Sequence, residues 1–510
     1  MKRWWLFEIN KNENPQLTSK MTNQKLSVVE KIGYSLGDLA ANLIFQTLMT
    51  FLAYFYTDVY KIPAGKASLI IFVGGFFGAF FNILMGIIAD RTNTRWGKFR
   101  PWILWTSVPF GIISLLAFST PNFSESGKVI YALITYFLLV IMYSANNLPY
   151  SALSGVLTGD MKERNSLSSY RFFAVMIAQF IIQSLLLPLA LSFGHGDKAK
   201  GFEKVMFIFA IVGVICFIIT FLTTKERITP AKEQQTSIKQ DLQDLSKNKP
   251  WLIMLALTIL VFITLSLKGG MYIYYFKYYL EEAAQANFLE NIGFNHFIQG
   301  LNAAITGMGF GEFEWPKDVA ASANSLFNAS GIIFNIIGIF LSKPLADKFG
   351  KRNVFGVFLL LSALCLICFN FYSPMAIDLV FITQILHGFF YGVTIPLLWA
   401  MIADVADYSE WKNNRRATAI IFSAMIFGLK MGLSIGGAIG AALLANYGYD
   451  ANAIQQGAST VAGIKMSVSI YPGLVFIVGA ASMIWYEINQ KMENTIENDL
   501  KTKRNGLDLK

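Results

Sequence analysis

Twelve apolar runs, each about 20 residues long or longer, constrain this chain more than any other feature. They occupy residues 30–57, 66–89, 101–120, 128–153, 168–193 and 204–224, then 251–279, 320–342, 354–372, 375–402, 418–446 and 467–487. A helix of about 20 apolar residues spans the hydrocarbon core of a bilayer, where backbone polar groups must be satisfied internally. The runs therefore predict an all-α membrane protein with twelve transmembrane helices.

A charged segment divides these runs into two sets of six. We expect residues 30–224 to form an N-terminal six-helix bundle and 251–487 a C-terminal one, with a cytoplasmic linker at 225–250. Residues 1–29 and 488–510 are expected to be a cytoplasmic N-terminal segment and a cytoplasmic tail. Residues 280–319 are expected to be an extracytoplasmic insertion, for which the sequence allows either a surface loop or an amphipathic lid.

Composition supports a membrane protein and excludes several other classes. Hydrophobic residues make up 54% of the 510 residues and charged residues 15%, against about 25% charged in soluble domains. The three cysteines lie inside apolar runs, so neither a disulfide framework nor a metal cluster is expected. We find no nucleotide-binding loop or nucleophile elbow, and we expect no enzyme activity and no cofactor.

The distribution of basic residues predicts the orientation of the chain. Lysines and arginines gather in the loops on one side, and the net charge of +10 reflects this bias rather than nucleic-acid binding. The opposite loops contain only Lys61, Lys66, Lys128, Lys198, Lys200, Lys204, Lys277, Lys317 and Lys465. The positive-inside rule then places both termini in the cytoplasm of a multi-pass protein of the inner (plasma) membrane.

Two loops repeat the same pattern about half a chain apart. Residues 86–98 read GIIADRTNTRWGK and residues 344–352 read PLADKFGKR, and each follows the second run of its half. Repeated halves are typical of secondary transporters, with a site between the halves near the middle of the membrane. Charge-assisted bonds on the cytoplasmic face could hold the halves together when the cavity opens outward, although the loops could also be ordinary positive-inside charge. The candidate gating residues are Asp90, Arg95, Lys98, Asp347, Arg352, Asp404 and Asp407.

Six segments together resemble one family. They are residues 89–102 (ADRTNTRWGKFRPW), 54–59 (YFYTDV), 147–150 (NLPY), 170–173 (YRFF), 403–408 (ADVADY) and 427–430 (FGLK). In this combination they resemble the glycoside–pentoside–hexuronide:cation symporters of the major facilitator superfamily, of which melibiose permease is the best-known member. The resemblance covers residues 30–490. It implies the major facilitator fold, two pseudo-symmetric halves, and import of a sugar coupled to a cation by a protein that we expect to be a monomer.

The resemblance also implies candidate sugar-binding residues. Lys430 and Arg171 match the family's basic residues at the sugar site, while Asn42 and Asn147 stand where members have acidic or polar sugar ligands. Tyr150 offers an aromatic ring for a sugar face. Lys430 could instead neutralise a carboxylate, and Arg171 could be a loop charge near the inner end.

Ionisable groups inside membrane helices are functional candidates by default. Asp38 lies four residues before Asn42, on the same helix face, and could bind sugar hydroxyls, carry a proton, or serve only as a cap or ion-pair partner. His387 lies three residues after Gln384, and either relays protons or is a hydrogen-bonded core histidine.

The second run departs from the family pattern at the cation site. Gly78 and Asn82 stand in the places of the family's two carboxylates, and Gly75 stands in the place of an arginine. Asn82 could offer an amide oxygen, but the usual sodium ligands are absent. We therefore favour protons over sodium as the coupling ion, through Asp38 and His387, with an uncoupled uniporter as the alternative.

Two other functions remain compatible with these residues. A lysolipid or another amphiphile could occupy an aromatic cavity of the same fold, and a sugar sensor that does not transport is a third possibility. The sequence leaves open which glycoside or hexuronide is bound, the oligomeric state, and the role of the 280–319 insertion.

Overall fold

A computed structural model describes residues 25–158, 161–227, 245–307, 315, 317–413 and 418–507 of the chain. Helices dominate this part, and its only β-bridge is an isolated one between Thr94 and Gly97. Eleven helical stretches within the described residues are long and apolar enough to cross a membrane. The shorter helix α4 (Arg100–Ala117) corresponds to the remaining predicted span at 101–120. The prediction of an all-α membrane protein is confirmed.

The N-terminal helices follow the predicted order closely. They are α2 (Val28–Tyr54) with the π-helical turn η1 (Phe55–Val59), α3 (Ala64–Arg91), α4, α5 (Glu125–Leu157), α6 (Met161–Phe180) continued by η2 (Ile181–Leu185) and α7 (Leu186–Gly194), and α8 (Lys198–Thr223). The C-terminal helices are α10 (Lys249–Tyr274) with η3 (Tyr275–Tyr279), α11 (Glu282–Asn291), α12 (Phe294–Gly307), α13 (Val319–Phe349), α14 (Lys351–Cys368) with η4 (Phe369–Phe371), α15 (Ile377–Asn413), α16 (Thr418–Asn446), α17 (Ala458–Val468), α18 (Ile470–Ser482) and α19 (Gln490–Leu507).

Short polar side chains set where several of these helices begin. Ser27 Oγ accepts the backbone N–H of Glu30 at 3.1 Å, and Asp318 Oδ1 accepts that of Ala321 at 2.8 Å. Asp197 and Asn248 cap α8 and α10 in the same way. Such caps satisfy N–H groups that have no partner inside the helix.

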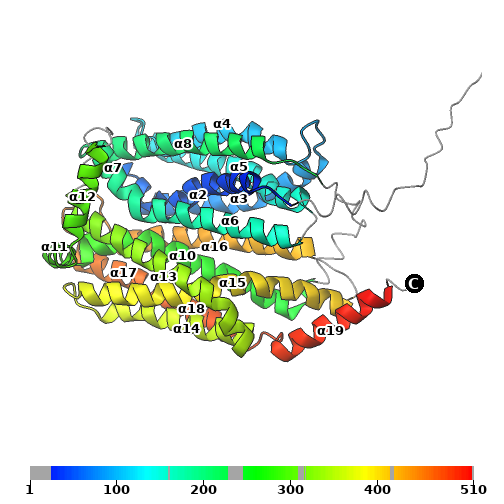
Figure 1. Ribbon diagram of the computed structural model, residues 1–510. Coiled ribbons are helices and arrows are strands. Elements are labelled where there is room, and N and C mark those ends of the chain that lie inside the picture. Colours follow the sequence, from blue (N-terminus) through cyan, green and yellow to red (C-terminus); the bar gives the residue numbers. More distant parts are fainter. Residues whose placement is uncertain are drawn as a thin grey trace, which may run out of the picture.

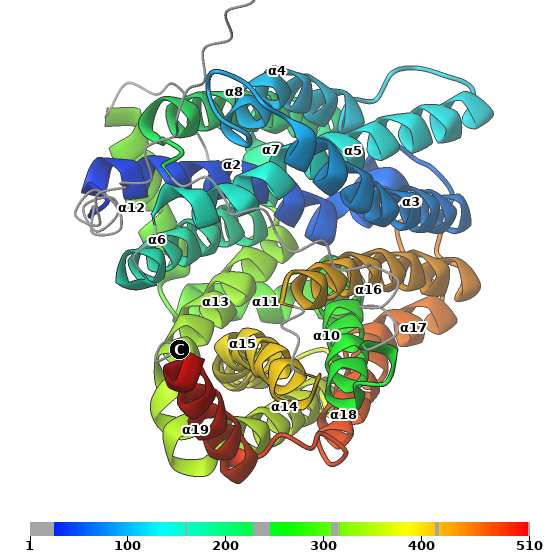
Figure 2. The ribbon, with the colours of Figure 1, turned by 90° about the vertical axis from the view of Figure 1, so that its right-hand side faces the viewer.

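The helices form two groups that run roughly parallel (Figures 1 and 2). Helices α2 to α8 make one group and α10 to α18 the other, with α3 packed against α16 where the groups meet. Figure 1 shows α11 and α12 at one end of the molecule and α19 at the opposite end. We call these the α11–α12 end and the α19 end.

Glycines let the helices of the second group approach closely. A Cβ atom on Gly388 of α15 would overlap the carbonyl oxygen of Gly331 on α13, and one on Gly432 of α16 would lie 2.6 Å from the carbonyl oxygen of Ile259 on α10. Small residues at such crossings allow close backbone packing in membrane proteins. This packing brings side chains of α10, α13 and α15 close together.

The structure adds detail that apolar runs alone did not predict. The 280–319 insertion contains two helices, α11 and α12, in its described part, rather than only irregular loop. The twelfth predicted run is interrupted at Ser469, between α17 and α18. The tail forms α19, with Ile496 and Leu500 buried, and it packs against α15.

Candidate functional site

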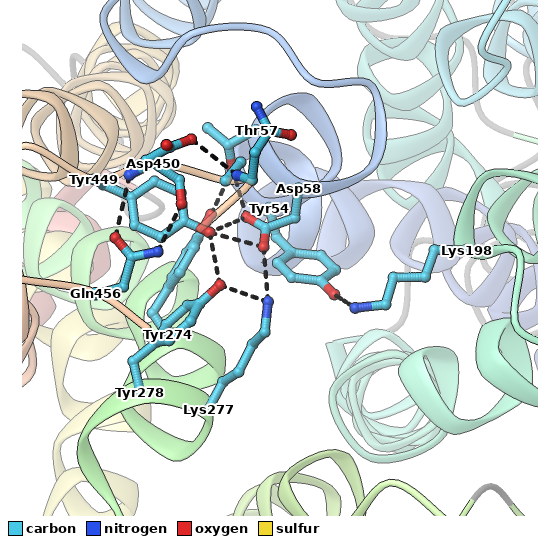
Figure 3. A network of polar contacts seen from close by, with 12 residues as sticks. Tyr54, Thr57, Asp58, Lys198, Tyr274, Lys277, Tyr278, Tyr449, Asp450 and Gln456 are labelled. Carbon is cyan, nitrogen blue, oxygen red and sulfur yellow. Dashed lines mark hydrogen bonds and ion pairs between the residues drawn. The ribbon is translucent and has the colours of Figure 1, made fainter. Parts of the chain in front are cut away.

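The two halves are joined at the α11–α12 end by a polar network around Asp58 (Figure 3). Lys277 Nζ lies 3.2 Å from Asp58 Oδ1, and the Tyr449 hydroxyl lies 2.8 Å from both carboxylate oxygens. Thr57 Oγ1 donates to Asp58 Oδ2 at 2.9 Å and lies 2.7 Å from the Tyr274 hydroxyl. Burial raises the pKa of Tyr449, so the phenol stays protonated and donates. We call these five residues the Asp58 network.

Candidate residues of the N-terminal half form a second cluster, toward the α19 end of α2. Arg171 Nε on α6 lies 2.8 Å from Asp38 Oδ2, and Asn42 Nδ2 donates to the carbonyl oxygen of Asp38 at 2.9 Å. The Arg171 guanidinium also lies 5.3 Å from the ring centroid of Tyr150. Asp38 and Arg171 therefore neutralise each other, and Arg171 is held inside the bundle rather than in a loop.

Two stacked tyrosines support this ion pair. The rings of Tyr34 and Tyr150 lie 4.6 Å apart, and each hydroxyl donates to the other residue's carbonyl oxygen, at 2.9 and 2.8 Å. These reciprocal hydrogen bonds hold both rings in place, so Arg171 packs against a Tyr150 ring of fixed orientation. Asn147, one turn earlier on α5, is half-buried and makes no side-chain hydrogen bond within the described chain.

Lys430 bridges the halves near the middle of α16. Its Nζ atom donates to Asn82 Oδ1 at 2.5 Å and lies 3.4 Å from Ser144 Oγ and 5.1 Å from the Tyr143 ring centroid. These neighbours are neutral acceptors, so among the described residues Lys430 does not neutralise a carboxylate. Lys430 lines a mostly apolar cavity between α2, α3, α5, α10 and α16.

A second cavity lies between α2, the α6–η2 segment and α10, α13 and α15, and its volume is about 210 Å³. It shares the lining residues Phe45 and Met49 with the apolar cavity. Its amide side chains are Gln46, Gln179, Gln183, Asn328, Asn335 and Gln384. We call it the amide cavity. Amides both donate and accept, and the rings of Tyr391 and Trp399 also line it, as binding of a hydroxyl-rich ring would require.

His387 belongs to the amide cavity together with a lysine. Lys268 Nζ lies 2.7 Å from His387 Nε2, and His387 Nδ1 lies 2.9 Å from Ser362 Oγ and 3.1 Å from the Ser362 carbonyl oxygen. The imidazole is therefore hydrogen-bonded on both nitrogens. Of the residues predicted from the sequence, His387 lines this cavity and Lys430 the apolar one, whereas Asp38, Asn42, Asn147, Tyr150 and Arg171 line neither.

The candidate gating residues lie at the α19 end. The contacts that the structure describes for them join residues of the same half. Lys351 Nζ lies 2.5 Å from Asp404 Oδ2 and 3.4 Å from Glu493 Oε2 of α19, while Arg352 Nη1 donates to the carbonyl oxygen of Tyr486 at 2.9 Å. The backbone N–H groups of Lys98, Phe99 and Arg100 donate to Glu226. Arg95 stacks on Trp96, and Asp347 is exposed. Asp407 is half-buried, and the Asp90 side chain lies outside the described residues.

Sequence reasoning missed the Asp58 network and most of the amide cavity. Asp58 stands inside a segment that resembles the family, and Lys277 ends the corresponding helix of the other half. The sequence signal that could have found this network is a pair of opposite charges, Asp58 and Lys277, at corresponding helix ends of the two halves. Among the described residues no three His, Cys, Asp or Glu side chains are placed to hold a metal ion.

Comparisons with known proteins find a matching family model and several similar proteins. The family model described as MFS/sugar transport protein matches residues 33–305 and 318–490. The chain is 35% identical to the inner membrane symporter YicJ of Escherichia coli, over 90% of this chain and 92% of that protein. It is 32% identical to the putative glycoside/cation symporter YagG of the same organism (93% and 95%), and 31% to the isoprimeverose transporter of Lactiplantibacillus pentosus (93% and 91%).

The fold is also found among solved structures. A bacterial homologue of the human lysosomal transporter Spinster superposes with a TM-score of 0.59 at 15% identity, covering 93% of this chain and 99% of the other. At that identity the likeness concerns the fold alone. Together with the family match, the described helices and this likeness give the major facilitator fold of twelve transmembrane helices.

Proposed function

Because this chain belongs to the MFS/sugar transport family, among its glycoside–pentoside–hexuronide:cation symporters, we propose that it imports a glycoside or related sugar by alternating access. The chain is a multi-pass membrane transporter of a sugar-transport family. The substrate, the coupling ion and the transport cycle are our proposals.

The amide cavity supports the proposal more than any other observation. Amide groups from both halves converge on it, and Asn328 Nδ2 of α13 donates to the carbonyl oxygen of Gln183 in η2 at 2.9 Å, so the wall is continuous across the halves. A sugar presents several hydroxyls that donate and accept, which amides can match. An amphiphile carrier would instead need an apolar chamber, and the apolar cavity offers only about 80 Å³.

The Asp58 network supports alternating access. It ties η1 of one half to η3 of the other at the α11–α12 end, while Lys351 and Asp404 at the α19 end pair inside one half. We place the α11–α12 end outside the cell and the α19 end, with both termini, in the cytoplasm. In this assignment the outer end is closed, and opening it requires the Asp58 network to separate.

Contacts of Lys430 support protons over sodium. Among the described side chains of α3, Asn82 offers the amide oxygen at the family's cation site, and this oxygen already accepts a hydrogen bond from Lys430. A sodium ion there would have to displace an ammonium without gaining a carboxylate ligand. Asp38, beside Arg171 and near the cavity-lining face of α2, is our first candidate for the transported proton, with His387 as a second.

Uptake by the purified protein in liposomes tests these points together. Counterflow of radiolabelled glycosides and hexuronides comes first, followed by uptake of the active sugar under an inward proton gradient, with and without a proton ionophore or sodium. We expect accumulation that the ionophore abolishes and sodium does not affect. Sodium-dependent uptake that ignores the ionophore would contradict proton coupling, equilibration without accumulation would indicate a uniporter, and no saccharide movement at all would contradict the function.

A further inference from the structure

Lys268 is a positive charge buried in the amide cavity, and no described residue gives it a negative partner. Its side chain is 8% exposed, and its Nζ atom lies beside His387, which is 1% exposed. Among the described residues no aspartate or glutamate lies within ion-pair distance of Lys268. A buried ammonium without a counter-ion costs several kcal/mol in a membrane protein, so such a residue usually has a partner during function.

Hydrogen bonding assigns the charge to the lysine rather than to the histidine. The Ser362 carbonyl oxygen lies 3.1 Å from His387 Nδ1 and can only accept, so this nitrogen carries the proton. His387 Nε2 is then an acceptor for Lys268 Nζ at 2.7 Å. A doubly protonated pair would place two cations at that distance, so the pair carries one charge, on Lys268.

Other charges near the two cavities do not compensate Lys268. Asp38 is paired with Arg171 at 2.8 Å, and their charges cancel. Lys430 is a second cation, but it lies in the apolar cavity and already donates to Asn82 and Ser144. The region between the halves therefore has an excess of positive charge, and Lys268 is the cation that faces the polar cavity.

Three residues that line the same cavity as Lys268 have buried polar atoms without partners among the described residues. Tyr272 Oη, Asn335 Oδ1 and Gln384 Oε1 are buried, and the structure gives none of them a hydrogen bond. All three residues line the amide cavity. Tyr272 lies one helical turn from Lys268 on α10, with Lys268 Nζ 5.6 Å from the centroid of its ring. Its hydroxyl can donate to an anion, whereas the two amide oxygens can accept from sugar hydroxyls.

We propose that the sugar carried by this protein bears a carboxylate, as in a hexuronide, and that this carboxylate binds to Lys268 with the Tyr272 hydroxyl as a second donor. The inference rests on the proposed function, because it names the class of sugar for the same cavity. Gln384 and Asn335 then bind hydroxyls of the sugar ring. A carboxylate beside Lys268 supplies the negative charge that the described residues do not place there.

Matched ligands test the proposal directly. Methyl glucuronides and methyl galacturonides of both anomeric forms differ from the methyl glucosides and galactosides only in the C6 carboxylate. Binding of each to the purified protein is measured by intrinsic tryptophan fluorescence, and counterflow of the tightest ligand is measured in liposomes. We expect at least one uronide to bind roughly 10- to 100-fold more tightly than its neutral partner, as a charge-assisted hydrogen bond predicts.

Variants then assign the preference to Lys268. Lys268→Met should remove the advantage of the uronide, measured as the ratio of uronide affinity to neutral-partner affinity within the same variant, and Lys268→Arg should retain part of it. Tyr272→Phe keeps the ring and should lower uronide affinity by a smaller factor. Lys204→Met removes an exposed lysine whose Nζ atom donates to the carbonyl oxygen of Phe193, outside both cavities, and serves as the control.

The outcomes separate the two levels of the proposal. Tighter binding and transport of the neutral partners, or a uronide preference that survives Lys268→Met in a protein that elutes as folded, would overturn the carboxylate site and leave sugar transport standing. If Lys268→Met does not fold, loss of the preference in Tyr272→Phe supports the site and an unchanged preference overturns it. Failure of every saccharide to move would overturn the proposed function itself.

Discussion

Asp58 and Lys277 form an ion pair between corresponding turns of the two halves, with 3.2 Å between Oδ1 and Nζ. Asp58 lies in η1, at the end of the first long helix of the N-terminal half, and Lys277 in η3, at the end of the first long helix of the C-terminal half. Both turns are π-helical, a geometry that is frequent at functional sites. The internal repeat thus provides opposite charges at two sites that meet only when the halves close at this end.

Asp58→Asn should weaken closure at the α11–α12 end. The amide keeps the size of the side chain but leaves Lys277 without its ion pair, and a loss of about 1–2 kcal/mol changes a two-state ratio by roughly 5- to 30-fold. Ser266→Cys, placed in the apolar cavity, reports opening through its reaction with a membrane-impermeant thiol reagent applied from outside. The exposed Cys368 is replaced by serine in all variants. We expect labelling to accelerate by that factor.

A charge exchange provides the control for this prediction. Asp58→Lys combined with Lys277→Asp restores an ion pair of reversed direction and should return labelling toward the slow rate. Equal labelling of the unchanged protein and Asp58→Asn would show that the ion pair does not hold this end closed.

Asp38→Asn should destabilise the N-terminal half because it leaves the Arg171 guanidinium without its counter-ion inside the bundle. Loss of one partner of a fully buried ion pair costs about 3–5 kcal/mol. The Arg171 side chain is 27% exposed, so a smaller loss is expected, and thermal unfolding in detergent measures it. Asp197→Asn is the matched control: its partner Lys200 is 3.6 Å away, both side chains are well exposed, and asparagine still caps the helix. Equal shifts for the two variants would contradict the buried pair, and Arg171→Met added to Asp38→Asn should recover part of the loss.

The helices were predictable from sequence because length and hydropathy act locally. A run such as 204–224 can satisfy its backbone in lipid only as a helix, and α8 spans Lys198–Thr223 accordingly. The cap residues that refine such ends, Asp197 for example, are short-range signals as well. In contrast, α19 depends on burial of Ile496 and Leu500 against the rest of the protein, and this requires the tertiary structure.

The candidate site was only partly predictable, because its residues are scattered. Asp38 and Asn42 share one helix face and could be paired from spacing alone. The amide side chains of the amide cavity instead come from several different helices, such as Gln46, Asn328 and Gln384, and no local motif connects them. Resemblance to a family found Lys430 and Arg171, but it gave no reason to single out Lys268 or Asp58.

Asn82→Asp should slow transport by strengthening the contact between α3 and α16. The new carboxylate would lie where Asn82 Oδ1 now accepts from Lys430 Nζ at 2.5 Å and would convert a neutral acceptor into an ion-pair partner. If the halves separate here during the cycle, the added charge-assisted bond must be broken each time, and roughly tenfold slower counterflow is expected. The same variant should unfold at a higher temperature. Asn93→Asp, in an exposed loop, is the control, and unchanged counterflow in Asn82→Asp would contradict separation at this contact.

Docking of α19 should depend on pH through Glu493. Burial raises the pKa of Glu493 above its ordinary value, and Lys351 opposes the shift only in part. A carboxyl whose pKa is higher in the docked state binds a proton more strongly there, so docking is strongest below its ordinary pKa and weakens as the pH rises through the raised value. Hydrogen exchange of the α19 amides between pH 4 and about 7, corrected for the intrinsic rates, should show protection falling in that window. Glu493→Gln should flatten this dependence, because it removes the carboxyl that titrates, while Lys351 still has Asp404 as an ion-pair partner at 2.5 Å. An unchanged slope in Glu493→Gln would assign the pH dependence to another group.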